Sequence, residues 1–133
     1  MIVADANVLF NLVFDTEQSQ EAHRIRSVDP HWRFPRLWRY EFSNAILKFV
    51  RAGICTPSAG DKALAKALSL FASHEAEVSD RLALQAAQEF GLSAYDALYV
   101  ALAMDLDVKL VTGDKALARK CPRQVILASD FGR

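Results

Sequence analysis

Four acidic residues lie just after expected strands or against the apolar faces of expected helices. Asp5 directly follows the apolar residues 2–4, and Asp114 lies two residues after the segment 109–112 (KLVT), so each acid comes just after an expected strand. The other two lie on or beside the apolar faces of expected helices; they are Glu41 and Asp96. Charged residues are rarely fully buried unless they are paired or bind a metal. These carboxylates are therefore the first candidates for chemistry.

Each acid also has a purely structural interpretation. Asp5 fits a turn residue before a helix, and Glu41 fits an ion pair with Lys48 two helical turns later. The segment 93–96 (SAYD) matches the S-x-x-D capping box. Asp114 follows a glycine and fits a helix N-cap. Taken one at a time, these interpretations stay open.

Taken together, the acids favour a metal site. The carboxyl ends of parallel strands lie at one edge of a sheet, where ligands gather. The helix that carries Asp96 leads into the strand before Asp114, so all four acids can face one pocket. A divalent cation would relieve their mutual repulsion, which otherwise raises their pKa values. Oxygen ligands favour Mg²⁺ or Mn²⁺ over zinc, and the matching chemistry is attack of a metal-bound water on a phosphodiester.

Short strands alternate with helices along the chain. The strands are expected at 2–4, 32–34, 76–78, 109–112 and 125–127. The helices are expected at 8–13 after an Asn7 cap, 17–27, 37–52, 57–72, 79–90, 93–104 and from Asp114 onward. This alternation predicts an α/β fold in which a parallel sheet is covered by helices on both faces.

Length and composition indicate one globular domain over residues 1–133. The hydrophobic fraction is 52%, which excludes the disordered class, and the formal net charge of zero names no partner. Two isolated cysteines indicate neither a disulfide scaffold nor a zinc site. No signal peptide is evident, and the longest apolar run, 97–104, is too short to cross a bilayer. We therefore expect a cytoplasmic protein without a membrane partner.

Other catalytic classes lack their motifs. The chain has neither the G-x-S-x-G elbow of serine hydrolases nor the G-x-x-x-x-G-K-[ST] loop of nucleotide-binding proteins. A phosphohydrolase of the haloacid-dehalogenase type also places an acid after its first strand and a Gly-Asp pair near a late strand. That class normally begins with D-x-D, whereas this chain has Asn7 at the second acidic position.

Four sequence blocks resemble the PIN-domain ribonucleases, and among them the VapC toxins of type II toxin–antitoxin modules. The blocks are IVADANVLF, PRLWRYEFSNAILK, LSAYDALYVALA and KLVTGDKAL, in this order. The resemblance covers essentially the whole chain. It implies a PIN-like three-layer α/β/α sandwich with a central, mostly parallel sheet of about five short strands.

The resemblance also implies roles for individual residues. Asp5 and Asp96 would bind Mg²⁺ or Mn²⁺ directly or through water, and Glu41 and Asp114 would complete the acidic pocket. The supporting residues would be Thr112, Asn7 and Asn44. Many relatives carry Ser or Thr at the position of Asn7. The implied activity is endonucleolytic cleavage of single-stranded or loop RNA, which leaves a 5′-phosphate and a 3′-hydroxyl.

The resemblance further implies a homodimer and a VapB-type antitoxin partner. The aromatic and basic segment HWRFPRLWRYEF contains Arg36, Trp38 and Arg39, which we interpret either as a contact surface for RNA or antitoxin or as helix core with a solvated face. The interval from Arg24 to Arg51 contains seven basic residues and two acidic ones, which we interpret either as a basic patch that faces nucleic acid or as a solvated helix surface. Two other functions stay open: a PIN-domain nuclease for RNA maturation and a non-catalytic PIN-like module that binds RNA or protein.

Overall fold

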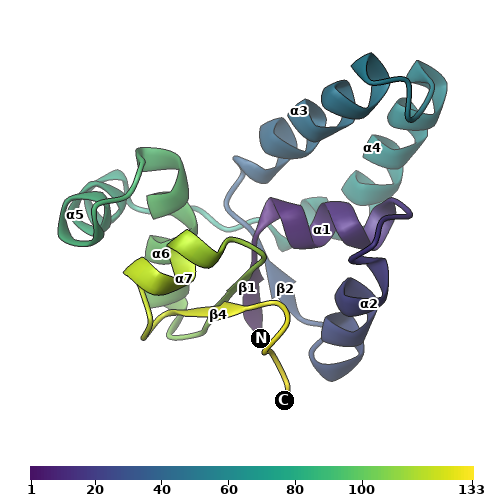
Figure 1. The fold of residues 1–133 in the computed structure, drawn as a ribbon. Helices are drawn as coiled ribbons and strands as arrows, with labels where there is room; N and C mark the ends of the chain where they lie inside the picture. The colour runs from purple at the N-terminus through teal and green to yellow at the C-terminus, as the bar shows by residue number, and fades with distance from the viewer.

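Four short parallel strands form the centre of the computed structural model, which describes residues 1–133 (Figure 1). They are β1 (Ile2–Ala4), β2 (Trp32–Arg33), β3 (Leu110–Thr112) and β4 (Val125–Leu127), in the order β2-β1-β3-β4. All three strand pairs are parallel, and β1 pairs directly with β3. The residues that follow β1 and β3 therefore meet at the same edge of the sheet.

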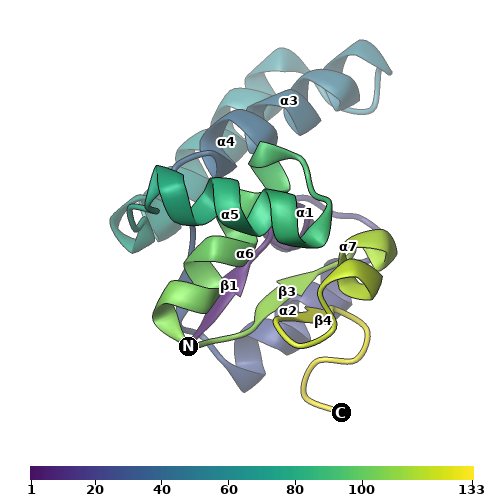
Figure 2. The same ribbon diagram turned by 90° about the vertical axis from the view of Figure 1, so that its left-hand side faces the viewer.

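Helices cover both faces of this sheet (Figures 1 and 2). One face is covered by the layer of α1 (Ala6–Val13), α2 (Ser19–Val28), α3 (Trp38–Arg51) and α4 (Pro57–Phe71), and the other by α6 (Ala94–Leu106) and α7 (Lys115–Lys120). The helix α5 (Asp80–Phe90) packs against α6. A short 3₁₀ turn, Ala72–His74, follows α4. The predicted three-layer α/β/α fold is confirmed. None of the helices has the length and apolar character that a membrane span requires.

The two apolar layers follow from the alternation of side chains along each strand. Ile2 and Ala4 pack into the cluster formed with α1 to α4, whereas Val3 packs against α6 and α7. On β3, Leu110 and Val111 divide between the same two clusters. Successive strand residues point to opposite faces, so three consecutive buried residues serve both layers.

The sheet has four strands rather than about five, because the expected strand at 76–78 does not form. The backbone N–H of Ala76 donates to the carbonyl of Phe34, and Glu75 forms an isolated bridge with the same residue. Pro35 follows Phe34 and has no N–H to donate, and the chain then turns into α3. Residues beyond Ala76 consequently have no strand beside them to pair with.

The first helix begins earlier than expected. Asp5, rather than Asn7, caps α1: one oxygen of its carboxylate accepts a hydrogen bond from the N–H of Ala6 at 2.8 Å. Asn7 lies inside the first turn, where its side chain is free to reach β3. The other helices begin and end within a few residues of the expected positions, with Thr56, Ser79 and Ser93 as N-caps of α4, α5 and α6.

The hairpin of α3 and α4 projects from the rest of the molecule (Figure 1), and its two helices meet closely at Gly60. A Cβ at Gly60 would lie 2.6 Å from Cγ2 of Ile46. We expect Gly60→Ala to lower the free energy of unfolding by about 1 kcal/mol, because overpacking outweighs the gain in helix propensity. Thermal or urea unfolding measures the change.

The solvent-facing position Ala65 in α4 provides the control for this prediction. Ala65→Gly reports the propensity difference alone, which is about 1 kcal/mol in a helix interior. If Gly60→Ala instead stabilises the chain by about 1 kcal/mol, the close contact with Ile46 does not destabilise the fold.

Candidate active site

The four predicted acids line one cleft of about 360 Å³. Asp5 lies at the end of β1, Glu41 in the first turn of α3, Asp96 in the first turn of α6, and Asp114 at the N-cap of α7. The cleft is also lined by the amides Asn7, Asn11 and Asn44 and by a single basic residue, Lys48. The structure therefore brings together acids that lie up to 109 residues apart in the chain.

Thr112 holds Asp5 in place from the neighbouring strand. Its hydroxyl donates a 2.7 Å hydrogen bond to Oδ2 of Asp5, and its side chain is fully buried. The same hydroxyl oxygen accepts the backbone N–H of Asp114 at 3.0 Å. One buried hydroxyl thus positions two of the acids relative to each other.

Asn7 links the end of β1 to the turn after β3. Its amide oxygen accepts the N–H of Gly113 at 3.2 Å. Its amide nitrogen lies 3.4 Å from both Oδ2 of Asp5 and the hydroxyl of Thr112. Asn7 therefore connects the two strand ends that carry Asp5 and Asp114, and it does not cap the helix as expected.

Glu41 is held by a residue that the sequence reasoning missed. The hydroxyl of Tyr99 in α6 donates a 2.7 Å hydrogen bond to Oε1 of Glu41, and the tyrosine is 1% exposed. Its only signal in the sequence is a polar hydroxyl on a helix that is otherwise apolar nearly all round. Glu41 forms no ion pair with Lys48, so that structural interpretation is wrong.

The capping interpretations of Asp96 and Asp114 hold in part. The hydroxyl of Ser93 accepts the N–H of Asp96, but the carboxylate of Asp96 makes no return bond to the backbone of Ser93. For Asp114, Oδ1 accepts the N–H groups of Ala116 and Leu117 at 2.9 and 3.1 Å. Capping therefore occupies one oxygen of Asp114 and leaves the carboxylate of Asp96 available to the cleft.

The environment of the cleft disfavours the ionised forms of its own carboxyl groups. Burial raises the pKa of Asp5 to about 7, against the opposing hydrogen bond from Thr112 and with further help from the charges of Glu41 and Asp96. Burial also raises the pKa values of Glu41 and Asp96, and each is raised further by a neighbouring carboxylate. A bound cation would favour the ionised forms of all of these groups.

The donor set has the chemistry that a hard cation requires. The cleft offers carboxylate and amide oxygens and no cysteine or histidine, which suits Mg²⁺ or Mn²⁺. No three acidic, histidine or cysteine side chains lie close enough together to hold a metal ion as they stand. The acids surround the cleft rather than forming a closed cluster, and Mg²⁺ commonly keeps several of its waters.

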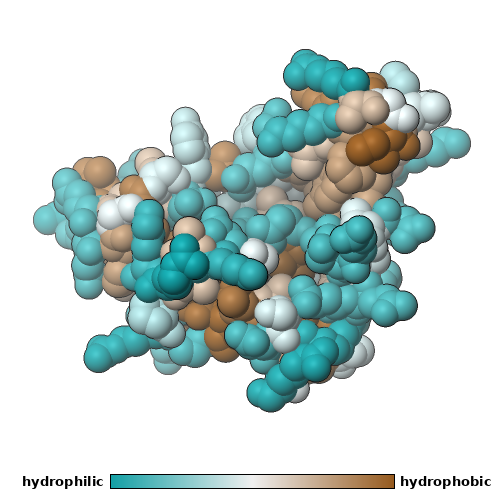
Figure 3. Space-filling model, in the orientation of Figure 1, coloured by the Kyte–Doolittle hydropathy of each residue, from teal (hydrophilic) through white to brown (hydrophobic).

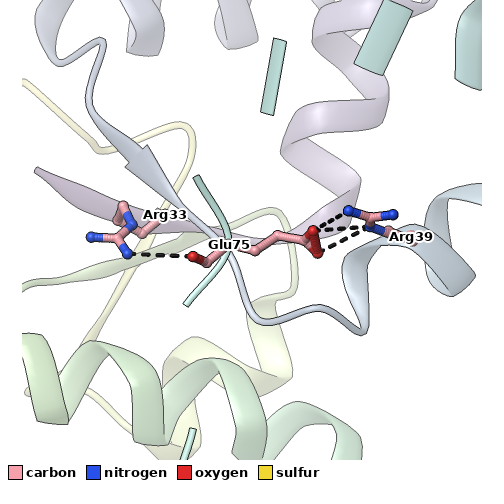
Figure 4. Close-up of polar contacts among 3 residues, drawn as sticks. All are labelled: Arg33, Arg39 and Glu75. Atoms are coloured by element: carbon pink, nitrogen blue, oxygen red, sulfur yellow. Dashed lines mark hydrogen bonds and ion pairs between the residues drawn. The ribbon is translucent and has the colours of Figure 1, made fainter. Parts of the chain in front are cut away.

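The three predicted contact residues of the aromatic and basic segment lie in different environments. Trp38 is fully buried in the core, so it cannot contact a partner, and this prediction is wrong. Nε of Arg39 lies 3.0 Å from each carboxylate oxygen of Glu75 (Figure 4), which ties the start of α3 to the loop after α4. Arg36 is exposed and lines a separate pocket.

Several other basic residues of the interval 24–51 are used inside the fold. The guanidinium of Arg24 donates to the carbonyls of Ala128 and Phe131, and that of Arg26 lies 5.5 Å from the ring centre of Phe71. Nε of Arg33 donates to the carbonyl of His74. The interval is therefore not a uniform basic surface, and much of its charge serves tertiary contacts.

Known proteins with similar sequences agree with the fold and with the resemblance to the PIN domain. The PIN-domain family model matches residues 2–121. The chain is 32% identical to Ribonuclease VapC3 of Pyrobaculum aerophilum over 129 residues, which cover 93% of this chain and 97% of that protein.

Solved structures show the same architecture. The crystal structure of PAE2754 from Pyrobaculum aerophilum is 29% identical and has a TM-score of 0.76, with 96% of this chain and 90% of that one covered. FitAcB from Neisseria gonorrhoeae is 15% identical, has a TM-score of 0.70, and is matched over 98% of this chain and 100% of its own. At that identity the likeness shows the fold alone. The chain therefore belongs to the PIN-domain family, as its four sequence blocks predicted.

Proposed function

We propose that the chain is a divalent-metal-dependent endoribonuclease that cleaves single-stranded or loop RNA and acts as the toxin of a toxin–antitoxin pair. The observation that carries this proposal is the single cleft in which four carboxylates from four separate elements meet. Membership of the PIN-domain family and 32% identity to a protein named Ribonuclease VapC3 support the choice of RNA as substrate.

In this proposal Asp5 and Asp96 hold Mg²⁺ or Mn²⁺, with Glu41 and Asp114 contributing directly or through water. When bound, the cation neutralises the charge that develops on the phosphodiester and lowers the pKa of an attacking water. The amides of Asn11 and Asn44 on the cleft wall can donate hydrogen bonds to phosphate or sugar oxygens.

The test is cleavage of RNA by the purified chain. Cleavage should require Mg²⁺ or Mn²⁺, stop on addition of EDTA, resume when the metal is returned in excess, and leave a 5′-phosphate and a 3′-hydroxyl. RNA binding without cleavage at any metal concentration would contradict the proposal and select the non-catalytic module.

The toxin role has its own test. Induced expression should arrest growth, and co-expression of a small neighbouring gene product, a VapB-type antitoxin, should restore it. The solved structure of FitAB bound to the IR36 DNA fragment is a structural neighbour, with a TM-score of 0.73 at 14% identity, and it shares the fold. An active enzyme whose overexpression is harmless would instead select RNA maturation. Light scattering measures the proposed homodimer.

Tyr99 should act as a positioning residue for Glu41. Tyr99→Phe removes the hydroxyl that donates to Oε1 of Glu41, and this bond holds the pKa of that carboxyl down. We expect cleavage to fall by about tenfold, the scale of one hydrogen bond to a charged group. The acidic limb of the pH–rate profile should move to higher pH. Tyr95→Phe, which removes an exposed hydroxyl from the same helix, is the control. Equal activity in both variants would remove Tyr99 from the site.

A further inference from the structure

One exposed face of α3 continues directly from the acidic cleft. Tyr40, Asn44, Lys48 and Arg51 follow the spacing of successive helical turns, so they share this face, and all four are exposed. Asn44 and Lys48 also line the cleft. We call these four residues the α3 track. It extends for about 16 Å along the helix axis, which is long enough to follow several nucleotides of a single strand.

The charge of the α3 track complements a polyanion. Lys48 and Arg51 form no salt bridge, so their charges are not neutralised by an acidic side chain. The only acid of α3 is Glu41, which lines the cleft together with Asn44 and Lys48 and belongs to the acidic site. Figure 3 shows hydrophilic side chains over α3, with apolar surface gathered at the far end of the hairpin. Lys48 on the cleft wall and Arg51 one turn further along α3 offset the repulsion that a phosphate chain would meet from the four carboxylates.

The aromatic residue of the track adds a surface for a base. The ring of Tyr40 is 63% exposed and adjoins Glu41 in the sequence, at the cleft end of α3. Unstacked bases of single-stranded RNA stack on exposed aromatic rings, while lysine and arginine contact the phosphates. Protein interfaces are also enriched in Tyr and Arg, but they are depleted of Lys, and Lys48 is the track's cation on the cleft wall. The composition of the track therefore favours RNA over protein.

We propose that the α3 track binds single-stranded RNA that extends from the cleft, with Lys48 and Arg51 on phosphates, Asn44 on the sugar–phosphate chain and Tyr40 stacked on a base. This inference rests on the proposed nuclease function and adds a binding surface to it. These residues are positioning residues, because they hold the strand away from the reacting atoms.

The test is the salt dependence of RNA binding. A fluorescent single-stranded RNA of about twelve nucleotides, comparable to known single-strand site sizes, is titrated with full-length protein carrying Asp96→Asn so that the probe stays intact. The double variant Lys48→Gln/Arg51→Gln should lower the slope of log K against log salt concentration by about 1.4, or about 0.7 per lost phosphate contact. The charge-preserving variant Lys48→Arg/Arg51→Lys should restore the slope.

The matched control removes the same number of charges from the neighbouring helix. Lys62 and Lys66 are exposed on α4 and do not line the cleft. Lys62→Gln/Lys66→Gln should leave the slope unchanged, and thermal unfolding verifies that each variant is folded. If the two double variants have the same slope, or if the parent does not bind the probe, the α3 track does not hold RNA.

Substitutions of Tyr40 test the proposal independently of the salt dependence. Tyr40→Leu should weaken binding about tenfold by loss of stacking, whereas Tyr40→Phe should bind like the parent. Loss of antitoxin binding with unchanged RNA binding in the Lys48 and Arg51 variants would overturn the proposal in favour of a protein surface. Cleavage by the otherwise unaltered chain is measured in parallel. If the unaltered chain cleaves RNA but the Lys48→Gln/Arg51→Gln variant keeps the salt slope of the parent, only RNA binding by the α3 track is refuted. If the unaltered chain does not cleave RNA, the nuclease function is refuted.

Discussion

Asp5→Asn and Asp96→Asn should each lower RNA cleavage by about 10²–10³-fold or more. Both substitutions keep the shape of the side chain and remove the negative charge that a divalent cation needs. The scale is that of losing one group that stabilises charge in a transition state. Single-turnover cleavage of RNA at saturating Mg²⁺ measures the loss, and the same variants should fail to arrest growth.

The control for this pair is Asp61→Asn. Asp61 is exposed on α4, outside the cleft, and its change from carboxylate to amide removes the same charge. Its activity should match that of the unaltered chain. Full activity in both Asp5→Asn and Asp96→Asn would show that the reaction takes place elsewhere on the molecule.

Asp5 should also make the metal-free protein less stable as the pH rises. Its pKa is about 7 in the folded chain, against an ordinary value of 3.8, so the folded state holds the proton more tightly than the unfolded state. Stability contributed by this proton is present at low pH and is lost between about pH 4 and pH 7. Asp5→Asn removes this titration. The free energy of unfolding of the variant should therefore rise relative to that of the unaltered chain by about 2–3 kcal/mol between pH 5 and pH 8.

Chemical unfolding in EDTA at the two pH values measures this difference. Adding Mg²⁺ at pH 8 should then raise the melting temperature of the unaltered chain, because a ligand that binds only the folded state stabilises it. The same addition should have a much smaller effect on Asp5→Asn. A constant difference between the two proteins across pH would show that Asp5 ionises in the folded chain as readily as in the unfolded one.

The coarse fold and the membership of the four acids in one site could be predicted from the sequence. The alternation of short apolar segments with amphipathic ones specified the parallel sheet and both helical layers, since strand and helix periods differ. Asp5 and Asp114 were recognisable because each follows a strand, and parallel strands end at a common edge. Their separate structural interpretations could not be decided locally: Asp114 both caps α7 and lines the cleft.

Contacts between distant residues depended on the tertiary structure. The bond from Tyr99 to Glu41 joins residues 58 positions apart, and the bond from Thr112 to Asp5 joins residues 107 apart. No local pattern encodes such partners. The expected strand at 76–78 also depended on the tertiary structure. A strand forms only where another strand lies beside it, and Pro35 ends the neighbouring strand.

The aromatic and basic segment separates what the sequence determines from what the tertiary structure decides. By itself the sequence determined that Trp38, Tyr40 and Lys48 share one amphipathic helix, because helical period depends only on residue type and order. Only the tertiary structure decided that Trp38 is buried in the core while Tyr40 and Lys48 face solvent beside the acids. The physical reason is that burial depends on which surfaces the sheet and the other helices cover, and that is a property of the assembled chain.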